Sequence, residues 1–198
     1  MKKIIAINGS PNASGNTYEL LSRLGAEIEK NGVSFELITI QEALSDLKIP
    51  YCVCCSSPCN QSCYQGTKME AVLQKCMEAD GIVFGSPVYF GSMSAQLKCF
   101  FDKTRDARGK KAFLGKPACA VSVGATKYGG QQSTLRSIQD CCMVLGFSIV
   151  TDAEEEFGCG HFGLSAQKPA CEDAYALARI PVLAKRMCRE VLKSSSGK

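Results

Sequence analysis

Residues 3–17 carry the sequence KIIAINGSPNASGNT, and this stretch decides the fold. The run from Lys3 to Asn8 is almost continuously apolar, which is typical of a parallel strand covered on both faces. Residues 8–11 then form a turn pattern, and from about Thr17 apolar residues recur at helical spacing as far as Lys30. A buried strand, a polar loop and a helix in succession predict the first unit of an α/β domain.

The same alternation continues to the end of the chain. Further strands are predicted at 33–40, 81–88, 117–125 and 147–151, and helices from Thr67, around 93–101 and 135–145, and at 171–192. Thr67 and Glu70 have capping-box spacing. The pattern predicts a parallel sheet with helices on both faces, which binds its ligand in the loops after strands one, three and four. We expect one domain over residues 1–193, with a cysteine-rich insertion at 50–66 and a tail at 194–198.

Composition narrows the class of protein. Of 198 residues, 45% are hydrophobic and 21% charged, as in soluble globular proteins. No apolar stretch approaches the roughly 20 residues that span a bilayer, and no Lys/Arg run points to nucleic acid. We therefore expect a cytoplasmic protein that binds neither membrane nor nucleic acid. Its 13 cysteines should then stay reduced, so a cysteine cluster indicates metal or redox chemistry.

The loop after the first strand has the chemistry of an anion site. Backbone N–H groups at the helix start attract a phosphate, and Ser10, Ser14, Asn16 and Thr17 add neutral donors. The loop lacks the lysine of a Walker motif and the GxGxxG pattern of dinucleotide sites. A single phosphate, as on FMN, fits best; the alternative is a polar capped turn without a ligand.

Three stretches together carry a family resemblance. They are the first loop (residues 9–17), the third-strand loop GSPVYFGS (85–92) with residues 96–102, and GGQQ (129–132). In order and spacing the chain resembles the flavodoxin-like NAD(P)H-dependent FMN reductases, and within them the iron–sulfur flavoproteins. This resemblance implies bound FMN, a five-stranded sheet in the order 2-1-3-4-5, and a homodimer or homotetramer.

The resemblance also assigns residues to the flavin. It implies that the phosphate is held by Ser10, Asn12, Asn16 and Thr17, that the ring and ribityl chain are cradled by Pro87, Val88, Tyr89, Phe90, Gly91 and Ser92, and that the other ring edge is closed by Tyr128, Gly129, Gly130 and Gln131. Core packing is the alternative for Tyr89 and Phe90. Family members often have a basic residue where Asn12 stands, so here the helix dipole and amides would meet the phosphate charge.

The cysteine-rich segment has the spacing Cys52-x2-Cys55-x3-Cys59-x3-Cys63, with Cys54 in addition. The iron–sulfur flavoproteins place a compact cysteine motif at this point of the chain, although their usual spacing, C-x2-C-x2-C and a later fourth, is not quite matched. We predict a 4Fe–4S cluster on Cys52, Cys55, Cys59 and Cys63, with Cys54 as a substitute. A four-thiolate zinc site and metal-free thiols or disulfides are the alternatives.

The predicted function is FMN-dependent electron transfer between a 4Fe–4S cluster, FMN and an external ferredoxin-like carrier, with no catalytic acid or base in the protein. One alternative is an NAD(P)H-dependent FMN or quinone-type reductase without a cluster, with NAD(P)H as its reductant. Another is a thiol- or metal-based redox sensor. His161, the only histidine, has no hydrolase motif around it, so a loop or subunit-contact role is expected.

Overall fold

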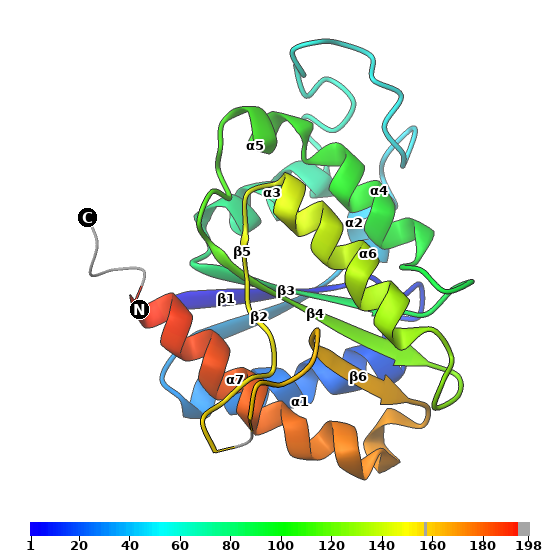
Figure 1. Ribbon diagram of the computed structural model, residues 1–198. Coiled ribbons are helices and arrows are strands. Elements are labelled where there is room, and N and C mark those ends of the chain that lie inside the picture. The colour runs from blue at the N-terminus through cyan, green and yellow to red at the C-terminus, as the bar shows by residue number, and fades with distance from the viewer. Residues whose placement is uncertain (157, 194–198) are drawn as a thin grey trace.

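The computed structural model describes residues 1–156 and 158–193, and a parallel sheet lies at its centre (Figure 1). Its strands are β1 (Lys3–Asn8), β2 (Ser34–Thr39), β3 (Gly81–Pro87), β4 (Pro117–Gly124) and β5 (Ser148–Ile149). They are ordered β2-β1-β3-β4-β5, and every pair is parallel. The predicted flavodoxin-like order 2-1-3-4-5 is confirmed.

Helices cover both faces of the sheet, as the alternating pattern predicts. The helices are α1 (Asn16–Lys30), α2 (Ile40–Leu44), α3 (Lys68–Glu78), α4 (Ala95–Lys103), α5 (Arg105–Gly109), α6 (Gln131–Val144) and α7 (Ala174–Lys193), with a 3-10 turn η1 (Ala170–Glu172) before α7. Helices α1 and α7 pack on one face, and α3, α4 and α6 pack on the other. Strand β1 serves both cores, because Ile5 and Ile7 face one and Ile4 and Ala6 the other.

The fifth strand position is split, which the sequence prediction of one strand at 147–151 missed. Strand β5 pairs with Pro117 and Ala118 near the start of β4. The chain then leaves the sheet and returns as β6 (Leu164–Gln167), which pairs with Val121–Gly124 further along the same strand. Strand β3 occupies the other edge of β4. Strands β5 and β6 therefore follow one another along a single edge. The four-residue β6 is too short to give a clear periodic signal.

Two other predictions about helix ends need correction. Helix α3 begins at Lys68, yet the Thr67 hydroxyl donates to the Tyr64 carbonyl rather than capping the helix. Asp46, distant in sequence, accepts from the Lys68 N–H at 2.9 Å instead, and Glu70 accepts from Gly66 N. The last helix begins at Ala174 rather than at 171, because residues 170–172 form the 3-10 turn.

Candidate functional site

The carboxyl ends of β1, β3 and β4 bring three loops side by side. Gly9 N donates to Gly85 O at 2.8 Å, and the Ser94 hydroxyl donates to the Gly9 carbonyl, so the first two loops are joined. Val88 N donates to Val123 O at 2.9 Å, which joins the second loop to β4. The sheet therefore assembles at one edge the three segments that the sequence marks as the ligand site.

The first loop is pre-shaped by its own short polar side chains. Asn8 Oδ1 accepts from Ser10 N, Ser10 Oγ from Asn12 N, and Asn12 Oδ1 from Ser14 N, each at 3.1 Å. Helix α1 starts directly after this loop and has no side-chain capping hydrogen bond. Its first N–H groups and the positive end of its dipole are therefore available to an anion.

Two of the residues that are predicted to hold the phosphate are already buried or hydrogen-bonded within the protein. Thr17 is 2% exposed at the base of the loop. Asn16 Oδ1 accepts from Ala170 N at 2.7 Å, so this amide also ties the start of α1 to η1. The Asn16 side chain thus has a structural task, and within it only the Nδ2 group can donate to a ligand.

The second loop is a tight turn that projects aromatic side chains. Tyr89 and Ser92 exchange backbone hydrogen bonds at 2.9 and 3.0 Å, and Phe90 and Gly91 between them have φ of +50° and +73°. The Phe90 side chain is fully exposed and that of Tyr89 about half exposed, so neither belongs to the core. Core packing, the alternative for these two aromatics, does not hold, and both stand where a planar ring could stack.

The third loop closes on the second through a glycine. At Gly130, φ is +93°, and a Cβ there would lie 3.1 Å from Gly91 Cα and 3.2 Å from Val88 Cγ1. Only glycine allows this close approach. Tyr128 beside it is 90% exposed. Gln131 is buried, and its Nε2 donates to Thr126 O at 2.6 Å, so this predicted flavin residue fastens its own loop through its side chain.

These features fit FMN. The uncapped start of α1 suits one phosphate, and the exposed aromatic side chains of the second and third loops offer faces on which a planar ring can stack. The sequence profile of the family "NADPH-dependent FMN reductase" matches residues 2–159.

The chain belongs to this family. An iron–sulfur flavoprotein of Methanocaldococcus jannaschii is 34% identical over 86% of this chain and 87% of its own length. An iron–sulfur flavoprotein of Methanosarcina thermophila is 32% identical over 94% of this chain and 93% of its own length. These relatives place the chain in the iron–sulfur flavoprotein branch of the FMN reductase family.

Solved structures agree with the fold. The intermediate-bound crystal structure of RosB superposes with a TM-score of 0.79 over 100% of this chain and 81% of its own, at 12% identity. The apo form of the NADH:FMN oxidoreductase EMOB superposes with a TM-score of 0.71 over 96% of this chain and 89% of its own, at 16% identity. As a member of the FMN reductase family, this protein is a flavin-dependent oxidoreductase, and FMN is the cofactor of the family. Among the helices described, none is both long and apolar enough to cross a membrane.

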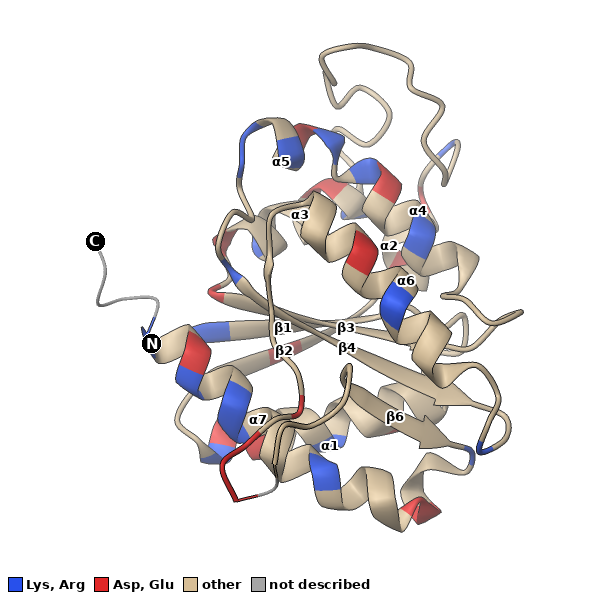
Figure 2. Cartoon of the chain, viewed as in Figure 1, with Lys and Arg blue, Asp and Glu red and all other residues tan. Residues whose placement is uncertain are grey.

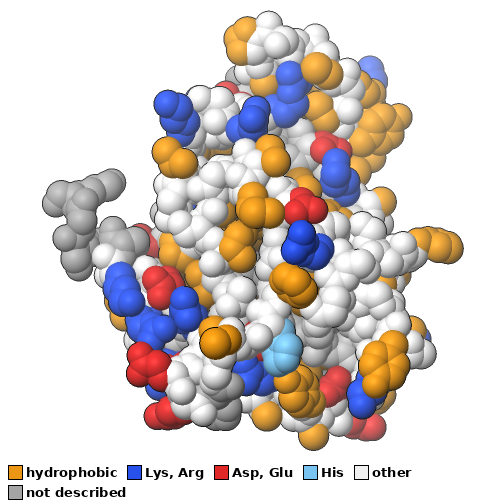
Figure 3. Space-filling model, in the orientation of Figure 1, with side chains coloured by type: hydrophobic (Ala, Val, Ile, Leu, Met, Phe, Trp, Pro, Cys, Tyr) orange, Lys and Arg blue, Asp and Glu red, His pale blue; other side chains and the backbone are white. Residues whose placement is uncertain are grey.

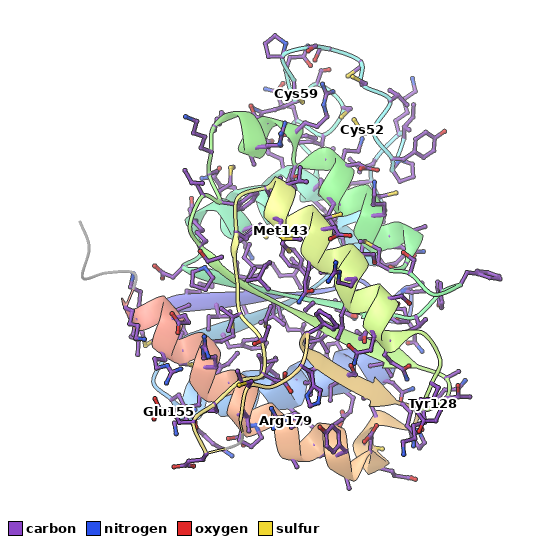
Figure 4. The ribbon with its side chains drawn as sticks, viewed as in Figure 1. Cys52, Cys59, Tyr128, Met143, Glu155 and Arg179 are labelled. Atoms are coloured by element: carbon purple, nitrogen blue, oxygen red, sulfur yellow. The ribbon has the colours of Figure 1, made fainter. Side chains whose placement is uncertain are left out.

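The cysteine loop (residues 51–66) extends beyond α4 and α5, whereas Tyr128 lies at the other end of the molecule (Figure 4). Cys52, Cys59 and Cys63 are partly buried, Cys54 and Cys55 are exposed, and all five are free thiols. Within residues 1–156 and 158–193, no three His, Cys, Asp or Glu side chains come together as a metal site. The number and type of sulfur donors suit a cluster, but the loop does not close them around a common centre; the ligand set stays a prediction.

Two cations from α4 and α5 reach the cysteine loop. Lys103 Nζ donates to Cys63 Sγ at 3.3 Å and to the Ile49 carbonyl at 3.0 Å. A hydrogen bond with Cys52 and the charge of Cys54 raise the pKa of Arg105. Both cations would compensate the negative charge of thiolates that hold iron.

A cavity of about 950 Å³ adjoins the third loop, and the sequence gave no sign of it. It shares Tyr128, Gly130 and Gln131 with that loop but takes no residue from the first two, so it neighbours the flavin loops without coinciding with them. Its far wall holds Asp152, which is 1% exposed and accepts from Arg179 Nε at 2.9 Å and from His161 N at 2.6 Å. The backbone of His161 thus fastens its loop to Asp152, and the role of the imidazole stays a prediction.

Proposed function

We propose that this oxidoreductase holds FMN at the carboxyl edge of the sheet and a 4Fe–4S cluster in the cysteine loop, and that it exchanges electrons with an external carrier. When bound, FMN supplies one- and two-electron redox chemistry and the cluster supplies one-electron transfer. The observation that carries the proposal is the pairing, in one chain, of the three FMN loops with a five-cysteine loop held by Lys103.

The chain's own residues have distinct tasks in this proposal. The first N–H groups of α1, with Ser10, Asn12, Ser14 and Thr17, would hold the phosphate. The turn at 87–92 and the loop at 128–130 would hold the ring and keep water from one of its faces. Cys52, Cys55, Cys59 and Cys63 would hold the cluster, with Cys54 as the substitute.

The surface around the cysteine loop suits an acidic partner. Figure 2 marks basic positions along α5 and just after it, close to the loop, with the acidic Asp106 among them, and Figure 3 shows Lys and Arg side chains on this part of the surface. A basic surface attracts an acidic one-electron carrier such as a ferredoxin-like protein. Because the cysteine loop and Tyr128 lie on different sides of the molecule (Figure 4), we expect electrons to pass through such a carrier or between subunits of the homodimer or homotetramer that the resemblance implies.

Anaerobic purification with FMN, iron, sulfide and zinc assayed per chain tests this proposal. We expect one FMN and about four irons and four sulfides. Cys52→Ser, Cys59→Ser and Cys63→Ser should each lose iron and keep FMN, whereas Cys171→Ser, an exposed cysteine outside the loop, should keep both. Stoichiometric zinc without iron would contradict the cluster, and absence of flavin would favour a thiol- or metal-based sensor.

A second candidate is an NAD(P)H-dependent FMN or quinone-type reductase without a cluster. The family's name favours it, and a quinone-reducing NAD(P)H dehydrogenase of Trichlorobacter lovleyi is 35% identical over 40% of this chain. Anaerobic mixing with NADPH distinguishes the two candidates. Rapid flavin bleaching in protein that takes up no iron would support the reductase.

A further inference from the structure

Lys103 is a buried charge that has no carboxylate partner within residues 1–156 and 158–193. It is the last residue of α4 and is 2% exposed. The two nearest acidic residues in sequence are engaged elsewhere, Asp102 with Lys98 at 2.6 Å and Asp106 with Lys110 at 2.8 Å. A lysine is rarely buried this deeply unless a specific partner compensates its charge. Among the described residues, the groups that its ammonium contacts are the Ile49 carbonyl and the Cys63 sulfur.

These two contacts lie at the two ends of the cysteine loop. Ile49 precedes the loop and Cys63 ends its run of cysteines, so one ammonium group joins both ends to α4. Next to Cys63, Tyr64 is buried in the core formed with α3 and α4. Cys63 is therefore held against the body of the protein, while Cys54 and Cys55 are exposed to solvent.

Arg105 lies beside Cys52, the first cysteine of the run, since the two residues line one hollow of the surface. It follows Lys103 by two residues and also lines a second hollow together with Cys59. The junction of α4 and α5 thus directs one cation to the first cysteine and another to the last. Four thiolates and the cluster that they hold carry net negative charge, which grows on reduction, so both cations oppose a charge that the bound cluster would bring.

We propose that Lys103 and Arg105 are positioning residues for the cluster: they fix Cys63 and Cys52 as its two outer ligands and raise its reduction potential by compensating the charge of the reduced form. This inference rests on the proposed function. Hydrogen bonds to the cluster sulfurs and nearby charge are the means by which a protein sets such a potential.

The test compares full-length Lys103→Met with wild type after anaerobic reconstitution with iron and sulfide. Methionine keeps much of the length of the side chain and removes its charge. We expect the variant to hold its iron less tightly against a chelator, by roughly 10- to 100-fold. The midpoint potential of its remaining cluster, followed by electron paramagnetic resonance, should be lower. Lys103→Arg, which restores the charge, should bring the potential back toward wild type.

Lys98→Met is the matched control, because Lys98 lies on the same helix but pairs with Asp102 at the surface. It should leave iron retention and potential unchanged. FMN content reports on the fold: a Lys103→Met protein that loses FMN as well as iron has unfolded. Arg105→Met then decides, because Arg105 is only partly buried and its removal leaves the core intact.

Unchanged iron retention and potential in both Lys103→Met and Arg105→Met would overturn the inference while leaving the cluster itself in place. Wild-type protein that takes up no iron under the same conditions would instead refute the proposed function, and this inference with it. A lower potential in both variants, with FMN retained, would support the assignment.

Discussion

Replacing Gly91 with alanine separates two tasks of the turn at residues 89–92. The backbone at Gly91 has φ of +73°, and a Cβ there would meet no atom closer than Ser133 Oγ at 3.6 Å. Without a clash, the added methyl costs the free protein only the strain of positive φ, about 1–2 kcal/mol. For a domain of this size that lowers Tm by roughly 2–8 °C.

The same strain is present whether FMN is bound or not, so by itself it leaves the Kd for FMN unchanged. If the ring lies against Gly91, however, the methyl also overpacks the flavin contact, at about 1–3 kcal/mol. That corresponds to a rise of roughly 5- to 150-fold in Kd. Thermal unfolding of the apoprotein measures the first effect, and titration of apoprotein with FMN, followed by flavin fluorescence, measures the second.

Gly115→Ala supplies the control. Gly115 has φ of +75° and nothing within 4 Å of the Cβ position, so it carries the same strain away from the three loops. It should lower Tm as Gly91→Ala does and leave the Kd alone. If Gly91→Ala also lowers Tm while the Kd for FMN stays within about twofold of wild type, the turn is structural and the flavin does not approach Gly91.

Three further perturbations test the site and the scaffold. Thr17→Val removes a hydroxyl beside the predicted phosphate and should weaken FMN binding, measured by titration, about tenfold or more. Thr134→Val is the control, because the Thr134 hydroxyl is buried without a hydrogen-bond partner among the described residues. This variant should leave the affinity for FMN unchanged. Asp152→Asn breaks the buried ion pair with Arg179 and should cost about 3–5 kcal/mol in denaturant unfolding; a loss below about 1 kcal/mol would mean that the pair behaves as a surface one. The pKa of Glu36 is lowered from its ordinary value of 4.5, chiefly by a hydrogen bond from Lys3 and then by one from Lys75, so its stabilisation is complete above that pH and is lost as pH falls through the folded pKa. Tm measured against pH should therefore differ between wild type and Glu36→Gln near neutrality and converge in acid, and a constant difference down to about pH 2 would contradict this sign.

Local chemistry made much of the fold predictable from sequence. The apolar run at 3–8 needs cover on both faces wherever it lies, and the helical spacing after Thr17 needs a core on one side. Together they imply the parallel sheet, and the polar loop between them implies the anion site. Loop chemistry is a property of neighbouring residues, which is why the three predicted flavin segments could be named before they were seen to meet.

Tertiary structure alone decided what depends on residues distant in the chain. Asn16 and Gln131 look like ligand donors in sequence, yet Ala170 and Thr126 engage their amides. Asp46 caps α3 at Lys68 from 22 residues away in sequence, and Lys103 contacts Cys63 from 40 residues away. Such partners are chosen by which helices pack together, and no local pattern encodes that choice. The sequence by itself determined the donor types at the flavin loops and the cysteine loop; only packing determined which cations, amides and carboxylates face them.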